Sequence, residues 1–111
     1  MSGWLETLVP GPVVVRQSSY DVPACNGQIV AIGSLSAACT VLLPAAPLLG
    51  QLVVVKRMGT VDGTITVDGN GKTIDGYSTL STPLGRDYAC VWLCYNGSAW
   101  SVLGTYYVMP S

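Results

Sequence analysis

The stretch YACVWLCYNGSAWSVL, residues 88–103, decides the fold class. Its Asn96-Gly97 pair is the strongest short signal for a β-hairpin, because both residues accept positive φ angles. A two-residue turn at this pair places Leu93 opposite Trp100 on neighbouring strands. One face of the hairpin then carries Val91, Leu93, Tyr95, Trp100 and Val102, and the other carries Cys90, Trp92 and Cys94 with Ala99, Ser101 and Leu103. Both faces are apolar, so we expect both to be covered, by a second sheet or by another subunit.

The remaining sequence has the same character. Thirteen glycines and seven prolines separate short runs that are rich in Val, Ile and Thr, which is typical of strands joined by tight turns. No stretch combines a helical period with helix caps. Strands are expected at 13–17, 28–32, 39–43, 51–57, 64–67, 72–74, 88–95 and 98–103. The segments 64–67 and 72–74 are expected to form a second hairpin through the turn at 68–71.

The length of 111 residues allows one domain with one core. We predict a short N-terminal arm over residues 1–12, whose apolar residues are followed by Pro-Gly-Pro. The arm is our candidate for attachment to a partner, through Trp4, Leu5, Leu8 and Val9. Residues 13–111 are predicted to form a single all-β domain: a compact antiparallel sandwich or barrel, or a β-prism-like fold.

Charge is scarce in this chain. Only 10% of the residues are charged and the net charge is -1, so no field attracts nucleic acid or an anionic membrane. No charged side chain occurs from Val22 to Val55. A surface covered by other protein explains this gap, and so does a buried sheet with polar loops. A membrane span is disfavoured because glycines, prolines and amides interrupt the stretch.

The four cysteines are Cys25, Cys39, Cys90 and Cys94. No secretory signal is recognisable at the N-terminus, so synthesis in the cytoplasm and reduced thiols are expected. On one strand, Cys90 and Cys94 would be about 13 Å apart, which is beyond disulfide range. Small buried apolar thiols are the simplest interpretation.

The sequence contains few residues that could form a catalytic site. Histidine is absent, which removes the commonest general base and most zinc sites. Asp62, Asp68 and Asp75 could pair as carboxylates for glycoside hydrolysis, but each precedes a glycine and is explained by a turn. We therefore predict that the protein is not an enzyme, and we assign no catalytic, cofactor-binding or metal-binding residue.

Three other motifs are better explained as turns. Gly71-Lys72-Thr73 lacks the upstream glycine of a phosphate-binding loop. The segment 68–73 starts like a calcium loop but does not continue as one. Asn96-Gly97-Ser98 is a glycosylation sequon without a secretion signal. Exposed tyrosines could bind a sugar, and the candidates are Tyr77, Tyr106 and Tyr107.

Residues 27–103 resemble the β-rich virion structural proteins of tailed bacteriophages. The resemblance rests on runs of strands and turns: VLLP at 41–44, GQLVVVK at 50–56, GTITV at 63–67, TIDG at 73–76 and VWLCYNGSAW at 91–100. These runs are strand and turn patterns and carry no signature chemistry. The family includes capsid decoration (cement) proteins and fibre or spike modules.

The resemblance implies a trimeric β-structure that binds a capsid or fibre by shape, without cofactors or metals. Our leading hypothesis is a decoration protein that is made in the host cytoplasm and joins the virion. Its partners would be its own copies and the major capsid protein or another virion protein, with no nucleic acid and no membrane. The oligomer contact is expected at Cys90, Trp92 and Cys94. A tail-fibre, spike or baseplate module is the first alternative, and a carbohydrate-binding domain is the second.

Overall fold

The computed structural model describes residues 11–107. In this range the chain is rich in strands, and its one helical element is the short 3-10 helix η1 (Thr82–Leu84). The strands are β1 (Val13–Val15), β2 (Ser19–Asp21), β3 (Gly27–Ile32), β4 (Cys39–Leu42), β5 (Leu52–Arg57), β6 (Ile65–Asp68), β7 (Thr79–Leu80), β8 (Cys90–Tyr95) and β9 (Trp100–Tyr106). The predicted dominance of strands over helix is confirmed.

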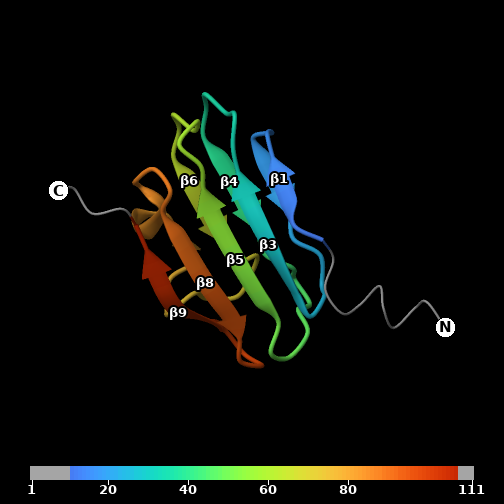
Figure 1. Cartoon of the computed structure of the whole chain (residues 1–111). Helices are drawn as coiled ribbons and strands as arrows, with labels where there is room; N and C mark the ends of the chain where they lie inside the picture. The colour runs from blue at the N-terminus through green and yellow to red at the C-terminus, as the bar shows by residue number, and fades with distance from the viewer. Residues whose placement is uncertain (1–10, 108–111) are drawn as a thin grey trace.

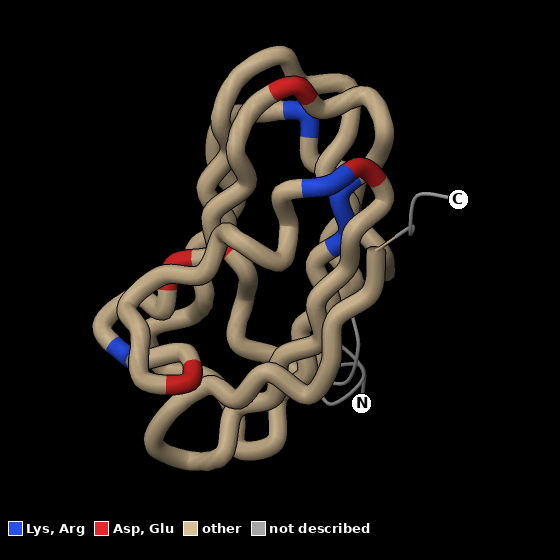
Figure 2. The backbone as a smooth tube through the Cα atoms, turned by 90° about the vertical axis from the view of Figure 1, so that its left-hand side faces the viewer, with Lys and Arg blue, Asp and Glu red and all other residues tan. Residues whose placement is uncertain are grey.

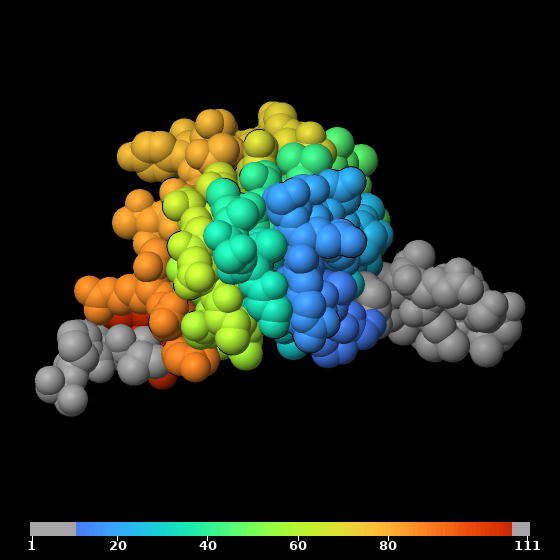
Figure 3. Space-filling model, turned by 90° about the horizontal axis from the view of Figure 1, so that it is seen from above, coloured from blue at the N-terminus to red at the C-terminus, as the bar shows by residue number. Residues whose placement is uncertain are grey.

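The strands form two sheets that face each other. Sheet A has the order β1-β3-β5-β8-β9, and sheet B has the order β2-β4-β6-β7. Sheet A lies towards the viewer in Figure 1. Through the first six strands the chain alternates between the two sheets, so that each pair of strands makes one coil around a shared core. Figure 3 shows these coils side by side in chain order, from blue through teal to yellow-green.

This winding makes the early strand pairs parallel. In sheet A, β1 pairs with β3 and β3 with β5 in parallel, whereas β8 is antiparallel to both β5 and β9. In sheet B, β2, β4 and β6 are parallel and β7 is antiparallel to β6. The expected antiparallel sandwich is therefore wrong in its pairing, and both sheets are mixed. Residue patterns within a strand report burial but not the direction of the neighbouring strand, so the sequence did not reveal the coils.

The core lies between the two sheets. Strand registers align inward-facing valines across sheet A, with Val13 beside Val30, Val30 beside Val55, and Val55 beside Val91. The last three of these side chains are fully buried. From sheet B, Val41 pairs with Val67 and closes the core from the other side. β-branched side chains pack well on such pleated surfaces, which explains why these runs become strands.

Buried polar side chains close the core near both ends of β5. At one end, Gln51 is fully buried and its Nε2 donates to the carbonyl of Pro23 at 2.8 Å. At the other end, Arg57 Nη1 donates to the carbonyl of Gly63 at 2.7 Å and Nη2 to that of Val61 at 2.8 Å. Arg57 Nε also lies 3.6 Å from the Asp87 carboxylate. These contacts tie the loops between strands to the sheet.

The hairpin expected between 64–67 and 72–74 is not formed. β6 instead pairs with β4 and β7, and residues 72–74 belong to no strand. Two tight turns intervene, at Asn70-Gly71 and at Asp75-Gly76, and all four residues have positive φ. The second turn folds Ile74 back onto Tyr77, which leaves Thr79 and Leu80 as the edge of sheet B.

The hairpin of β8 and β9 is confirmed, but its expected register is wrong. Tyr95 pairs with Trp100, and Leu93 pairs with Val102. The connection is a four-residue loop in which Gly97 has positive φ and Asn96 does not. The Asn96 side chain instead accepts hydrogen bonds from the backbone N–H of Ser98 and of Ala99, both at 3.0 Å. A shift of two residues keeps the same side chains on each face.

Candidate interaction face

The outward side of sheet A is apolar. Alternation along each strand turns large apolar and aromatic side chains away from the core, and those that are between 40% and 63% exposed are Val14, Ile29, Leu52, Trp92, Leu103 and Tyr106. Val54 lies half-buried among them. We call this surface the apolar face. It spans all five strands of the sheet, and scattered exposed residues would not produce such an arrangement.

The outward side of sheet B has the opposite character. Its side chains are small and polar or acidic, apart from one half-buried leucine: Ser19, Asp21, Thr40, Leu42, Thr66, Asp68 and Thr79. A sheet with one buried and one solvated face normally shows this alternation. The outer side of sheet B therefore has the composition of a solvent-facing surface, and the outer side of sheet A does not.

Charge is also unevenly placed. The strands of sheet A contain only two charged residues, Lys56 and Arg57, and Arg57 is buried. Figure 2, in which the layers are seen edge-on, shows charged residues near one end of sheet A and none along the rest of it. Lys56 is therefore the one outward-facing charge within the strands of sheet A, and Arg16, just after β1, lies at the rim of the apolar face beside Val14.

The Lys56 ammonium is held by neighbouring tyrosines. Its Nζ donates to the carbonyl of Tyr88 at 2.6 Å. It also lies 5.9 Å from the ring centroid of Tyr88 and 5.5 Å from that of Tyr106, within range of cation–π attraction. Cys90 lies beside it on β8. Burial raises the pKa of the Cys90 thiol, and the nearby Lys56 charge opposes that shift in part.

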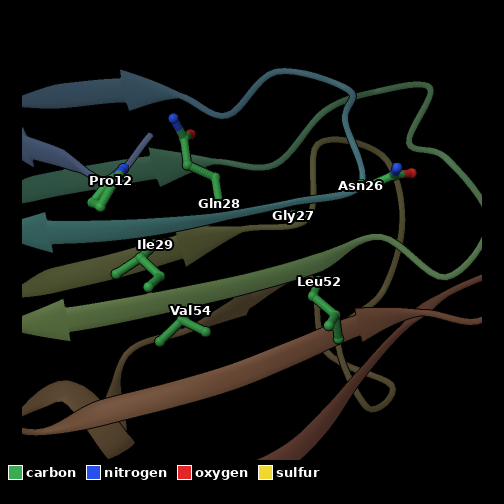
Figure 4. Close-up of a pocket in the computed structure, with 7 residues that line it drawn as sticks. All are labelled: Pro12, Asn26, Gly27, Gln28, Ile29, Leu52 and Val54. Atoms are coloured by element: carbon green, nitrogen blue, oxygen red, sulfur yellow. The ribbon is translucent and has the colours of Figure 1, made fainter. Parts of the chain in front are cut away.

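A hollow of about 260 Å³ opens on the apolar face, over β3 and β5. Figure 4 shows its lining residues, which are Pro12, Asn26, Gly27, Gln28, Ile29, Leu52 and Val54. The hollow exists because Gly27 has no side chain. A Cβ at Gly27 would lie 3.2 Å from the carbonyl oxygen and 3.5 Å from the Cβ of Leu52. The side chains around the hollow are mainly apolar, so it suits an apolar group.

The other half of the face, on β8 and β9, carries the exposed side chains of Trp92 and Leu103. A bulge between Trp92 and Leu93 brings Gly104 opposite Trp92. A Cβ at Gly104 would be 3.9 Å from Cε3 of Trp92, so the indole ring lies beside the glycine. Leu103, beside Gly104, is the most exposed side chain of the face. We call Trp92 and Leu103 the ridge.

The expected contact residues lie on this face. Trp92 is exposed and Cys94 is half-buried on the outward side of β8. Cys90 points the same way but is already buried within the subunit. The expected attachment residues Trp4, Leu5, Leu8 and Val9 lie outside the described residues.

Sequence reasoning missed the other half of the face. Val14, Ile29 and Leu52 were not expected to share a surface with Trp92. For Leu52 a signal was present in the uninterrupted apolar run at 52–55, because a strand without alternation is typically covered on both sides. Parallel pairing of β1, β3 and β5 is the fact that joins them, and residue patterns do not report it.

The turn aspartates have structural roles. Asp68 Oδ1 accepts the backbone N–H of Asn70 at 2.8 Å, and Asp75 Oδ1 accepts that of Val102 at 3.3 Å. Within residues 11–107, no three His, Cys, Asp or Glu side chains gather closely enough to hold a metal ion. The same range contains no helix with the length and apolar character needed to cross a bilayer.

The tyrosines proposed for sugar binding are not grouped. Tyr77 has an exposed side chain and its backbone pairs with Ile74, which also bridges to Trp100 at the start of β9. Tyr106 ends the same strand, six residues later, or about 20 Å away. Tyr107 follows it and stacks on the Arg86 guanidinium, 4.6 Å from the ring centroid. The three rings do not form one platform.

No protein-family model matches the chain, and no curated protein is significantly similar to it. The apolar face is therefore the main structural clue to function.

Proposed function

We propose that this chain is a non-enzymatic structural protein of a tailed-bacteriophage virion, and that it decorates the capsid as an oligomer. The observation that carries the proposal is the apolar face of sheet A, set against the polar outer side of sheet B. A contiguous exposed apolar patch rimmed by polar residues marks an interaction site. A protein with one such side is built to be covered on that side and to face solvent on the other.

The polar groups of the fold support a structural role. Arg57 and Gln51 are buried; both Nη atoms of Arg57 and Nε2 of Gln51 donate to backbone carbonyls, and Arg57 Nε lies against the Asp87 carboxylate. Asp68 and Asp75 are used to hold turns. Each of these groups already has a partner that accounts for its position. Attachment by shape and apolar contact is the activity that the surface supports.

A tail-fibre, spike or baseplate module is the second candidate. The observation in its favour is the winding of the chain, in which successive coils stack parallel strands on one another. Repeated coils can propagate along an axis because each coil contacts only its neighbours. In this chain the stack ends in the antiparallel pair of β8 and β9, which favours a compact module over a shaft.

Co-sedimentation with virion parts tests the proposal. Virions of the phage that encodes the chain would be separated into capsids and tails, and the purified chain added to each. We expect it to pellet with capsids. A chain that begins at Gly11 lacks the attachment residues Trp4, Leu5, Leu8 and Val9, and should bind at least about tenfold more weakly.

Two results would count against a decoration protein. Pelleting with tails alone would replace it with the second candidate. Pelleting with neither part would overturn the proposed function altogether.

A further inference from the structure

We propose that a second copy of this chain covers the apolar face, with the ridge of one copy seated in the hollow of the next. This inference rests on the proposed function, because it names the surface through which the decorating oligomer forms. It also changes the expected contact. Cys90 is buried inside the subunit, and the face extends to Ile29, Leu52 and Leu103.

The charge distribution favours a like partner. Within its strands the apolar face presents no charge beyond Lys56, whose ammonium is already bonded to Tyr88 and flanked by two rings. Arg16 lies only at the rim, beside Val14. A partner surface therefore needs to be apolar over most of its area. Within residues 11–107 that description fits the apolar face itself. The outer side of sheet B would bury the negative charges of Asp21 and Asp68 against an apolar surface with no cation opposite them, which is costly.

The size of the face is close to what a stable contact needs. Four strands about 20 Å long and the three-residue β1, about 10 Å long, give a sheet surface of about 430 Å² at a spacing of about 4.8 Å. A second copy laid on it removes about 860 Å² in total before projecting side chains are counted, against about 1,000 Å² for a specific protein interface. Projecting side chains such as Trp92 and Leu103 add to this area.

The relief of the face is self-complementary. The hollow lies over β3 and β5, and the ridge lies on β8 and β9, so the two occupy opposite halves of one surface. A two-fold rotation about an axis along the strands brings the ridge half of one copy onto the hollow half of the other. Trp92 and Leu103 are then the groups that fill the space above Gly27.

The test measures the mass of the whole chain in solution, without capsids, by light scattering at micromolar concentration. The wild type should have at least twice the 11.6 kDa subunit mass. Leu52→Lys in the hollow and Leu103→Lys on the ridge should each weaken association by at least about 100-fold, because every contact then buries an unpaired charge. Thr40→Lys on the outer side of sheet B is the matched control and should remain oligomeric. Circular dichroism checks that each variant is folded.

A double variant tests the ridge-to-hollow contact itself. Leu52→Lys combined with Leu103→Glu sets opposite charges against each other at each such contact, so association should recover relative to either single change. A monomeric wild type, single variants that stay oligomeric, or a double variant that fails to recover would overturn the inference. A monomer that still pellets with capsids would overturn the inference alone. An oligomer that binds neither capsids nor tails would overturn only the proposed function.

Discussion

Tyr95 and Trp100 face each other across the last hairpin, with ring centroids 5.5 Å apart and planes inclined at 49°. This pair sets the register of β8 and β9 and places Trp100 fully inside the core. Eight positions earlier in the sequence, Trp92 lies on the opposite, outward side of the same hairpin. Trp100 therefore contributes to folding, and Trp92 is placed for contact with a partner.

Substitution of the two tryptophans should show this separation. Trp100→Ala should lower the free energy of unfolding by about 3–5 kcal/mol, because it leaves a large cavity between the sheets. Trp92→Ala removes a side chain that is 40% exposed and should cost about 1 kcal/mol or less in the dissociated subunit. Urea unfolding of both variants in the monomeric Leu52→Lys background measures the difference. Equal losses would contradict the assignment of the two faces.

Arg57→Met should destabilise the fold by about 2–4 kcal/mol, because it leaves the buried carbonyl of Val61 and the part-buried carbonyl of Gly63 without donors. The apolar stem of methionine keeps most of the packing, so the loss reports the hydrogen bonds. Arg16→Met is the control, since Arg16 is exposed and should change stability by no more than about 0.5 kcal/mol. Thermal unfolding compares them. A stable Arg57→Met variant would show that the guanidinium does not close the core.

Asn96→Ala should cost about 1 kcal/mol, because the side-chain oxygen of Asn96 accepts two backbone N–H groups of the hairpin loop. Asn96→Asp retains an acceptor at that position and should be close to the wild type. Unfolding in urea distinguishes the two variants. If alanine were harmless and aspartate were not, the loop would not be held by this oxygen.

The thiols should differ in reactivity. Burial raises the pKa of Cys25, Cys39 and Cys90, so less thiolate is present to react at these sites. In the Leu52→Lys subunit, half-buried Cys94 should react first with a disulfide reagent at pH 8. Four thiols should react after denaturation without reductant. A lower total would mean that a disulfide is present.

The same shifts give a pH dependence. Because the folded-state pKa values of the three buried thiols lie above the ordinary value of 9.0, the stability they contribute is complete below pH 9.0 and is lost as the pH rises through the folded values. Replacing Cys39 by alanine should flatten the alkaline part of the stability curve. An unchanged slope would argue that Cys39 ionises as readily in the folded chain as in the unfolded one.

The two faces of the last hairpin could be predicted from sequence, because side chains alternate along each strand. The observed register differs from the expected one by two residues, and an even shift leaves every side chain on its expected face. The register itself could not be predicted. Asn70-Gly71 and Asp75-Gly76 adopt positive φ at both residues, whereas Asn96 spends its side chain on capping the loop. Which of these options an Asn-Gly pair takes depends on contacts beyond the pair. The partners of β6 were missed for the same reason: the Asn70-Gly71 pair does not by itself decide which strands lie beside β6.

The candidate site was half predictable. Trp92 and Cys94 follow from alternation along one strand. Ile29 and Leu52 join them only because β3 lies parallel to β5 and next to it, a long-range pairing between segments about 25 residues apart. The hollow depends on a further detail, the missing side chain of Gly27. A sequence pattern reports which residues turn outward, but not which outward residues become neighbours.

The most direct test of the account is a cryo-electron microscopy map of intact particles of the phage that encodes the chain. The account predicts density for the two-sheet fold on the capsid, with the apolar faces of neighbouring copies packed together and the outer sides of sheet B towards solvent. A map without this fold on the capsid, or one in which sheet A of each copy is open to solvent, would contradict it.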